Sequence, residues 1–315
     1  MRKVILTGKH GRPSTKLAWS FLSTDVNNPI TLVQRRQFTK KNGKFVQYYR
    51  IFGDTSLYDE SQLYQLKFKN FNFDNSVIIR WGTRENITAN NSIIYNKAGA
   101  IANATDKLIS RQLFIKNDVS APRLLNHIDD YNSGVVIARP YIHSKGKNLI
   151  VLNNKQELQN HWRNGWYYSE FIDKVREFRV HVGHSKVLAL MEKHNPNNGS
   201  IAWNRAQNDT EPFTRIKQAE ADDQNLLSVL QEAIKAVNAL GLDMGGVDVM
   251  LDKDGIAYVL EVNTAPTLNS SPKVAEMWSK YWQWLLRINS KRDHWDFLVF
   301  KKASSLFWKQ NQLEE

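Results

Sequence analysis

The sequence contains no cysteine among its 315 residues. Disulfide bridges, thiolate zinc sites and a cysteine nucleophile are therefore excluded. The sequence also has no apolar run approaching the roughly 20 residues of a membrane span, and its first residues, MRKVILTGKHGRP, lack the apolar region of a signal peptide. We expect a soluble, cytoplasmic and globular protein that is long enough for two domains or one elaborate domain.

Acidic residues are scarce in the first fifty positions, where Asp25 stands alone against eleven Lys and Arg. This segment carries most of the net charge of +12. A basic patch attracts anions, so a nucleic acid, a phosphorylated ligand or an acidic peptide is a candidate partner. A basic surface that only maintains solubility is the alternative.

The order of the elements is typical of an α/β protein. We expect helices at 14–22, 97–116, about 155–163 and 222–240. Strands are expected at KVILT, ITLVQRRQF, KFVQYYRIF, SVIIRW, VSAPRLL, VVIARPYI, WYYSEFI, EFRVHVG and KVLALMEKH, the last two forming a pair that turns at 183–185.

The segment from residue 273 onward has a helical pattern with aromatic residues on one face. Basic residues between the tryptophans would suit base stacking on a nucleic acid. Eight basic residues against five acidic ones are too mild a bias for that function. We therefore expect a helix that packs this face on the body of the protein. The aromatic face consists of Trp278, Tyr281, Trp282 and Leu285.

Two apolar strands are separated by Asp254 and Gly255 in the segment GGVDVMLDKDGIAYVLEVN, which predicts a hairpin. With these two residues as the turn, Asp248 lies opposite Glu261, and Asn263 follows on the same face. The other face is expected to be the core face. It would carry Val247, Val249, Leu251, Tyr258, Leu260 and Val262.

Two carboxylates and an amide oxygen on one face would repel one another and lose hydration unless a cation lay between them. Hard oxygen donors favour Mg²⁺ or Mn²⁺ over Zn²⁺. The pattern thus indicates a metal site made by Asp248, Glu261 and Asn263, and a polar, solvated sheet face is the alternative.

The segment GGVDVMLDKDGIAYVLEVNTAPTL is similar to the metal-binding signature of ATP-grasp enzymes of the carboxylate-amine ligase type, and the resemblance extends over 96 to about 270. It implies an α+β or α/β protein with the ATP-grasp fold. It further implies that Asp248, Glu261 and Asn263 hold two Mg²⁺ ions, with Mn²⁺ as a substitute, that bridge the phosphates of ATP.

The resemblance also implies the division of the chain. We expect a basic N-terminal α/β domain at 1–95 that resembles the domain preceding many ATP-grasp folds. An ATP-grasp domain follows at 96–272, with one nucleotide-binding lobe at 96–172 and a second lobe at 173–272 that carries the metal site. An aromatic, helical C-terminal extension occupies 273–315.

The resemblance assigns several basic residues to the nucleotide. Lys107, after Asp106, would contact it, with a solvated helix cation as the alternative. Arg139 stands where the family has a lysine that reaches the adenine and phosphates, and a guanidinium also binds phosphate. Lys145 and Lys147 lie where the family has a glycine-rich lid, and a plain exposed turn is the alternative there.

The segment SEFI resembles the hinge that recognises adenine. The resemblance implies that Glu170 binds the adenine amino group and that main-chain groups of Phe171 and Ile172 bind its edge. Glu177 matches the acid that binds the ribose hydroxyls, with Asp173 as a rival.

Three further basic residues match catalytic positions of the family. Arg179 would stabilise the transferring phosphate. Lys193 and Arg205 would neutralise the acyl phosphate or a substrate carboxylate, with ordinary surface charges as the alternative. No general base is evident, and neither His181 nor His194 is assigned a role.

These expectations describe an ATP-dependent ligase that joins a carboxylate to an amine through an acyl phosphate and releases ADP and phosphate. The basic N-terminal domain favours an acidic substrate such as glutamate or an acidic peptide. An ATP-grasp kinase that phosphorylates a hydroxyl is the alternative. A nucleic-acid-binding protein is the alternative from a different class, and the oligomeric state is left open.

Overall fold

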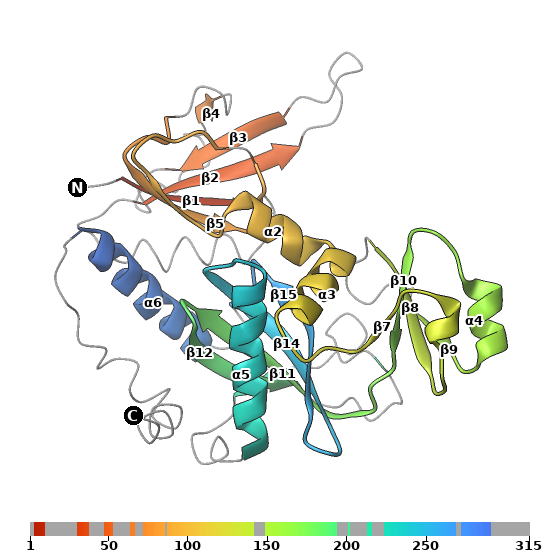
Figure 1. The fold of residues 1–315 in the computed structure, drawn as a ribbon. Coiled ribbons are helices and arrows are strands. Elements are labelled where there is room, and N and C mark those ends of the chain that lie inside the picture. Colours follow the sequence, from red (N-terminus) through yellow and green to blue (C-terminus); the bar gives the residue numbers. More distant parts are fainter. Residues whose placement is uncertain are drawn as a thin grey trace. The chain divides into compact units, whose positions relative to one another are not determined.

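The computed structural model describes residues 3–9, 30–37, 47–52, 64–66, 72–85, 87–141, 149–193, 201, 213–215, 224–268 and 272–290 (Figure 1). The chain divides into two compact units. The first comprises Met1–Ala102, Gly241–Gly245 and Thr264–Lys301, and the second comprises Asn103–Leu240, Gly246–Asn263 and Lys302–Glu315.

A six-stranded sheet forms the first unit, in the order β4-β3-β2-β1-β5-β6. Strand β1 pairs in parallel with β2 and β5, β5 pairs in parallel with β6, and β3 is antiparallel to β2 and β4. Four of these strands were predicted, while β4 and β6 were not, and the expected helix at 14–22 lies outside the described residues. The strands are β1 (Lys3–Lys9), β2 (Ile30–Gln37), β3 (Gln47–Phe52), β4 (Tyr64–Leu66), β5 (Ser76–Trp81) and β6 (Ile93–Tyr95).

The aromatic helix α6 (Pro272–Ser290) belongs to the first unit. Trp278 and Trp282 are fully buried, and their rings meet the ring of Trp81 edge to face at centroid distances of 5.2 and 5.3 Å. Tyr281 and Leu285 are buried as well. Such edge-to-face aromatic contacts add to the stabilisation from burial. The prediction that this face packs on the protein body is confirmed, and these rings are not exposed for stacking on bases.

The start of β14 (Met244–Asp252) is fixed by Asn96, which is fully buried and has a φ of 55°. Its side-chain oxygen accepts hydrogen bonds from the main-chain N–H groups of Asp243 and Met244, at 2.9 and 3.1 Å. Its side-chain nitrogen donates to the Met244 carbonyl at 3.0 Å. Asparagine tolerates this left-handed conformation better than most residues.

The single helix expected at 97–116 is two helices, α2 (Ala98–Thr105) and α3 (Lys107–Lys116). Asp106 between them is extended, and its carboxylate accepts hydrogen bonds from the N–H groups of Leu108 and Ile109 at 3.0 and 3.1 Å. An aspartate in this N-cap position begins a helix rather than continuing one. As a result, Lys107 is the first residue of α3.

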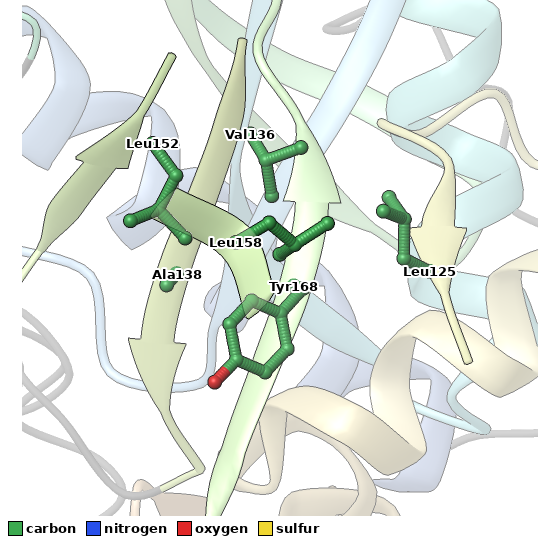
Figure 2. Close-up of a cluster of buried hydrophobic side chains, with 6 residues drawn as sticks. All are labelled: Leu125, Val136, Ala138, Leu152, Leu158 and Tyr168. Atoms are coloured by element: carbon green, nitrogen blue, oxygen red, sulfur yellow. The ribbon is translucent and has the colours of Figure 1, made fainter. Parts of the chain in front are cut away.

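A four-stranded sheet in the order β7-β10-β8-β9 forms one part of the second unit. Helix α4 (Lys155–His161) contributes Leu158 to the core of this sheet, as predicted for a helix near 155–163 (Figure 2). The core cluster is Leu125, Val136, Ala138, Leu152, Leu158 and Tyr168. The strands are β7 (Leu124–Leu125), β8 (Val136–Pro140), β9 (Ile150–Leu152) and β10 (Trp166–Glu170), and a 3₁₀ turn η3 spans Ile128–Asp130.

A five-stranded sheet in the order β13-β12-β11-β14-β15 forms the other part of the second unit. Helix α5 (Gln224–Ala239) packs on it, with Leu226, Val229 and Ala233 fully buried. The predicted turn between β11 and β12 is confirmed by the positive φ of His184 and Ser185. The remaining strands are β11 (Lys174–Gly183), β12 (Lys186–Lys193), β13 (Phe213–Arg215) and β15 (Ala257–Asn263).

None of the helices in the described parts of the chain has the length and apolar content needed to cross a membrane.

Candidate active site

The hairpin of β14 and β15 pairs Asp248 with Glu261 and Gly246 with Asn263, which confirms the predicted pairing. The predicted two-residue turn is wrong, because the loop has the three residues 253–255, closed by a hydrogen bond from Gly255 N–H to the Asp252 carbonyl at 3.2 Å. The register then shifts at a bulge between Asp248 and Val249, where Leu260 is the extra residue of β15. The extra loop residue and the bulge offset each other.

The shifted register changes which residues of β15 face the core. Ala257 and Val259 are buried, whereas Tyr258 and Leu260, which were predicted on the core face, are only partly buried. A shift of one residue moves every side chain between the shift and the turn to the opposite face. Strand β14 is buried over nearly its whole length, and Asp248 is 6% exposed. The alternative of a solvated sheet face does not hold at Asp248.

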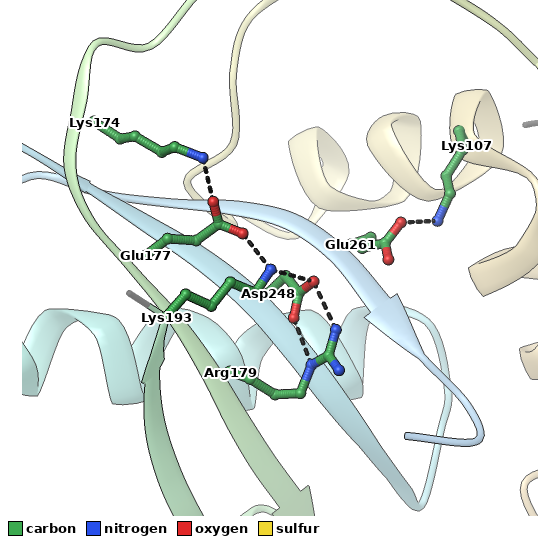
Figure 3. Close-up of polar contacts among 7 residues, drawn as sticks. All are labelled: Lys107, Lys174, Glu177, Arg179, Lys193, Asp248 and Glu261. Atoms are coloured by element: carbon green, nitrogen blue, oxygen red, sulfur yellow. Dashed lines mark hydrogen bonds and ion pairs between the residues drawn. The ribbon is translucent and has the colours of Figure 1, made fainter. Parts of the chain in front are cut away.

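Asp248 is held by two cations, one from the adjacent strand β11 and one from β12 beyond it (Figure 3). The guanidinium of Arg179 donates from Nε and Nη2 to the two carboxylate oxygens at 2.7 and 2.9 Å, and Lys193 Nζ donates to Oδ2 at 3.1 Å. Burial alone would raise the pKa of Asp248, but Arg179 and Lys193 hold it well below its usual range. The carboxylate therefore stays ionised despite its burial.

Glu177 on β11 is a second buried carboxylate close to Asp248. Its carboxylate pairs with Lys174 and with Lys193, so Lys193 bridges Glu177 and Asp248 (Figure 3). Burial acts to lower the pKa of Lys193, but Asp248 and Glu177 raise it above its ordinary value. The pKa of Lys174 is lowered, mainly by burial.

Glu261 pairs with Lys107 at the start of α3, and their oxygen and nitrogen are 2.7 Å apart (Figure 3). The side chain of Glu261 is 37% exposed and that of Lys107 is 15% exposed. Lys107 lowers the pKa of Glu261. The solvated-cation alternative for Lys107 does not fit this contact.

Arg139 lies on β8, where the prediction placed it, opposite Tyr167 on β10. Its Nε is buried and has no hydrogen-bond partner in the described parts of the chain. Its charge contributes to the lowered pKa values of Lys174 and Arg111. Arg139 is thus close enough to Lys174 and Arg111 for its charge to act on both.

The predicted adenine hinge lies at the end of β10. Glu170 accepts a hydrogen bond from the Arg123 N–H at 3.1 Å. The N–H of Phe171 donates to the Val135 carbonyl at 2.8 Å, and the Ile172 carbonyl accepts from Lys174 N–H at 2.9 Å. The adenine contacts of this segment stay a prediction.

Four of the residues discussed from the sequence, Lys145, Lys147, His194 and Arg205, lie outside the described residues. The described site residues all belong to the second unit. The sequence analysis missed Lys174, because it lies three positions before Glu177 and side chains at odd spacing in a strand point to opposite faces. The one feature of the sequence that could have indicated this contact is that Lys174 is the first residue of β11, where the regular alternation of side chains begins.

His181 is fully buried on β11. Burial and, to a lesser degree, the charge of Arg179 lower its pKa to about 3, with Asp248 acting in the opposite direction. The imidazole is therefore uncharged at neutral pH.

This pKa predicts a pH dependence of folding. Below its ordinary pKa of 6.5 the unfolded chain binds a proton at His181 that the native chain does not bind, so the free energy of unfolding falls as the pH falls from about 6.5 toward about 3. The expected slope from this residue is up to about 1.4 kcal/mol per pH unit. We expect His181→Gln to remove it, as measured by urea unfolding of the metal-free protein between about pH 6.5 and about pH 4.5.

His127→Gln is the control for replacing a histidine outside the core, because the His127 side chain is exposed. Wild-type and His181→Gln curves that ran parallel over this range would show that His181 titrates normally.

The oxygen donors of the hairpin fit a hard divalent cation. Asp248 and Glu261 are cross-strand partners, and Asn263 lies two residues beyond Glu261 on β15, hence on the same face. In the described parts of the chain, no three His, Cys, Asp or Glu side chains gather as a metal-binding group. A metal site on this hairpin would therefore need the Asn263 amide oxygen as its third protein donor, and this role stays a prediction. Carboxylate and amide oxygens suit Mg²⁺, which keeps several of its waters.

The RimK-like ATP-grasp domain family matches residues 104–277, which is more than half of the chain and includes the whole hairpin. The fold is that of an ATP-grasp protein. Within that class, the chain belongs to the RimK-like ATP-grasp family.

One similar protein is the tetrahydromethanopterin:alpha-L-glutamate ligase of Methanocaldococcus jannaschii, which is 25% identical over 205 residues. The match covers 58% of this chain and 66% of that relative, slightly less than two thirds of its length.

Solved structures share the fold at low sequence identity. A Chryseobacterium gregarium RiPP-associated ATP-grasp ligase, in complex with ADP and a leader and core peptide, is 13% identical, with a TM-score of 0.58 and coverage of 93% of this chain and 99% of that one. The D-alanine–D-alanine ligase of Bacillus anthracis is 14% identical, with the same TM-score and coverage of 93% and 100%. The predicted ATP-grasp fold is confirmed.

Proposed function

We propose that this protein is an ATP-dependent carboxylate-amine ligase that forms an amide or peptide bond and releases ADP and phosphate. The observation that carries the proposal is that two acids of one hairpin each pair with cations from other elements. Asp248 is held by cations from β11 and β12, and Glu261 is held by a cation from α3. Membership of the RimK-like ATP-grasp family supports ATP as the nucleotide, and a relative named as a glutamate ligase supports the formation of an amide bond.

Phosphoryl transfer requires charge neutralisation and positioning more than covalent work by the protein. A substrate carboxylate would attack the γ-phosphate of ATP, and the bond to ADP would break as the acyl phosphate forms. An amine would then attack the acyl carbon and expel phosphate. Arg179 and Lys193 would donate hydrogen bonds to the phosphoryl oxygens, because both are charged and held in place by Asp248.

The nucleotide would contact Lys107 and Arg139, and the hinge residues Glu170, Phe171 and Ile172 would hold the adenine. The role of Glu177 at the ribose, and the roles of Lys145, Lys147 and Arg205, belong to the same proposal. When bound, Mg²⁺ offsets the negative charge of the phosphates, and Asp248, Glu261 and Asn263 would hold it.

The proposed carboxylate or amine substrate is an amino acid or a peptide, and an acidic one such as glutamate is favoured. The archaeal relative is named as a glutamate ligase, and residues 1–50 carry a large excess of basic residues that would attract an acidic partner.

Purified protein incubated with Mg-ATP and mixtures of amino acids or peptides tests the proposal. We expect ADP and a new amide, both detected by mass spectrometry, and neither with the Asp248→Ala variant. ADP with a phosphorylated hydroxyl and no amide would instead identify a kinase. ADP formation no greater than that of the variant would refute the proposed activity.

A further inference from the structure

Arg111 on α3 is a buried cation that the proposed chemistry does not use. Its residue is 4% exposed, and its guanidinium donates to two consecutive main-chain carbonyls of β15. Nη1 lies 2.5 Å from the Val259 oxygen and Nη2 lies 3.0 Å from the Leu260 oxygen. Burial lowers the pKa of Arg111 to about 10, so the group is still charged at neutral pH.

The two carbonyls belong to the bulge that sets the register of the hairpin. Leu260 is the extra residue, and Val259 and Glu261 lie on either side of it. Strand β15 is at the edge of its sheet among the described strands, so none of them pairs with the carbonyls on its outer side. A buried carbonyl without a donor costs about 1–3 kcal/mol, and the guanidinium supplies donors for both.

The bulge also determines where Glu261 points. If the extra residue were lost from this position, pairing would continue from the turn in the unshifted register, and Glu261 would no longer lie opposite Asp248. Arg111 therefore stabilises the one register that brings the two acids together.

Helix α3 holds the same stretch of β15 at a second point. Lys107 and Arg111 are four residues apart and so lie on the same face of the helix. Lys107 binds the carboxylate of Glu261, while Arg111 binds the two carbonyls that precede it. The helix thus fixes both the side chain and the backbone of this acid.

We infer that Arg111 is a positioning residue, which keeps the bulge at Leu260 and thereby aims the Glu261 carboxylate at the divalent cation. This inference rests on the proposed function, because it concerns the same metal-binding hairpin. Arg111 touches neither the metal nor the nucleotide in this scheme and acts only through β15.

The test compares Arg111→Met, which keeps the apolar stem and removes all donors, with Arg111→Lys, which keeps the charge but cannot bind both carbonyls as a planar fork. Lys116→Met is the matched control, because it removes a positive charge from an exposed position of the same helix. The affinity for Mn²⁺ is measured by electron paramagnetic resonance in the presence of a non-hydrolysable ATP analogue. Circular dichroism shows whether each variant is folded.

We expect Arg111→Met to weaken Mn²⁺ binding about 10- to 100-fold, as is typical for loss of a group that orients a metal ligand. Arg111→Lys should recover part of the loss, and Lys116→Met should bind like the wild type. Nucleotide affinity without metal should be unchanged in all three variants, which a general loss of structure would not allow.

Wild-type Mn²⁺ affinity in folded Arg111→Met would overturn the positioning role while leaving the proposed function intact. If Arg111→Met does not fold, Arg111→Lys decides, and undiminished Mn²⁺ binding by it has the same meaning. A wild-type protein that binds no Mn²⁺ with the analogue would refute the proposed function and the positioning role together.

Discussion

Replacement of Asp248 by Asn is expected to reduce ATP-dependent turnover on the order of 10³-fold or more, a loss comparable to removing a central electrostatic group of an active site. The amide has nearly the same shape but no negative charge. The substitution would remove the charge-assisted hydrogen bonds to Arg179 and Lys193. It would also remove the negative charge that is proposed to hold Mg²⁺ opposite Glu261. ADP release at saturating Mg-ATP and substrate measures the effect.

Asp254→Asn is the matched control for this experiment. It makes the same chemical change on the same hairpin, but in the loop, where the side chain is 66% exposed. An Asn-Gly pair also suits a tight turn, so the control should fold and turn over like the wild type. If folded Asp248→Asn retained more than about a tenth of the wild-type turnover, the proposed role of Asp248 in the reaction would be wrong.

The pairing of Asp248 with Glu261 could be predicted even though the turn was predicted wrongly. An Asp-Gly pair locates a turn, but it does not fix whether two or three residues form the loop. The alternation of side chains predicts faces only in an uninterrupted ladder, and the bulge at Leu260 interrupts this one. The residues around the bulge do not indicate it, because its two carbonyls accept hydrogen bonds from Arg111, which is far away in the sequence.

The break between α2 and α3 illustrates a signal that was present in the sequence. Asp106 precedes a run with helical spacing, and an aspartate there is a preferred N-cap. The helical periodicity on both sides concealed it.

The partners of the buried lysines illustrate the opposite case. Lys193 reaches both Glu177 and Asp248 only because β11 lies between β12 and β14, and this order of strands is not encoded at any single position. The resemblance to ATP-grasp enzymes identified the charged residues, but it did not predict which acid each cation binds.

The second large effect is expected on stability, from Glu177→Gln. Glu177 is 3% exposed and offsets the charges of Lys174 and Lys193, whose side chains are only 8% and 6% exposed. Removing one partner of a buried ion pair costs about 3–5 kcal/mol, because the other charge is left uncompensated. Asp248 would still pair with Arg179 and Lys193, but Lys174 and Lys193 would lose their ion pairs with Glu177. Urea unfolding of the metal-free protein measures the change in the free energy of unfolding.

Glu192→Gln on the neighbouring strand β12 is the matched control. Glu192 also binds a cation in a two-point contact, with Arg176 Nε and Nη2 at 2.6 and 2.8 Å, but the two side chains are 28% and 30% exposed. A pair this accessible to water is worth about 0–1 kcal/mol. Equal losses from the two variants would mean that burial does not govern the cost, and that Glu177 has no special part in balancing the charge of the site.

An added anion distinguishes charge balance from simple loss of packing in Glu177→Gln. With Glu177 neutral, Lys174 and Lys193 lose the charge of one carboxylate that pairs with them, so phosphate should bind the folded variant more tightly than the wild type. A ligand that binds only the folded state raises the free energy of unfolding by RT times the natural logarithm of one plus the ratio of its free concentration to its Kd, so phosphate should restore part of the lost free energy. Restoration equal to that in Glu192→Gln would show that the stability was lost through packing. Greater restoration in Glu177→Gln would show that this acid keeps a strongly cationic centre folded when no phosphate occupies it.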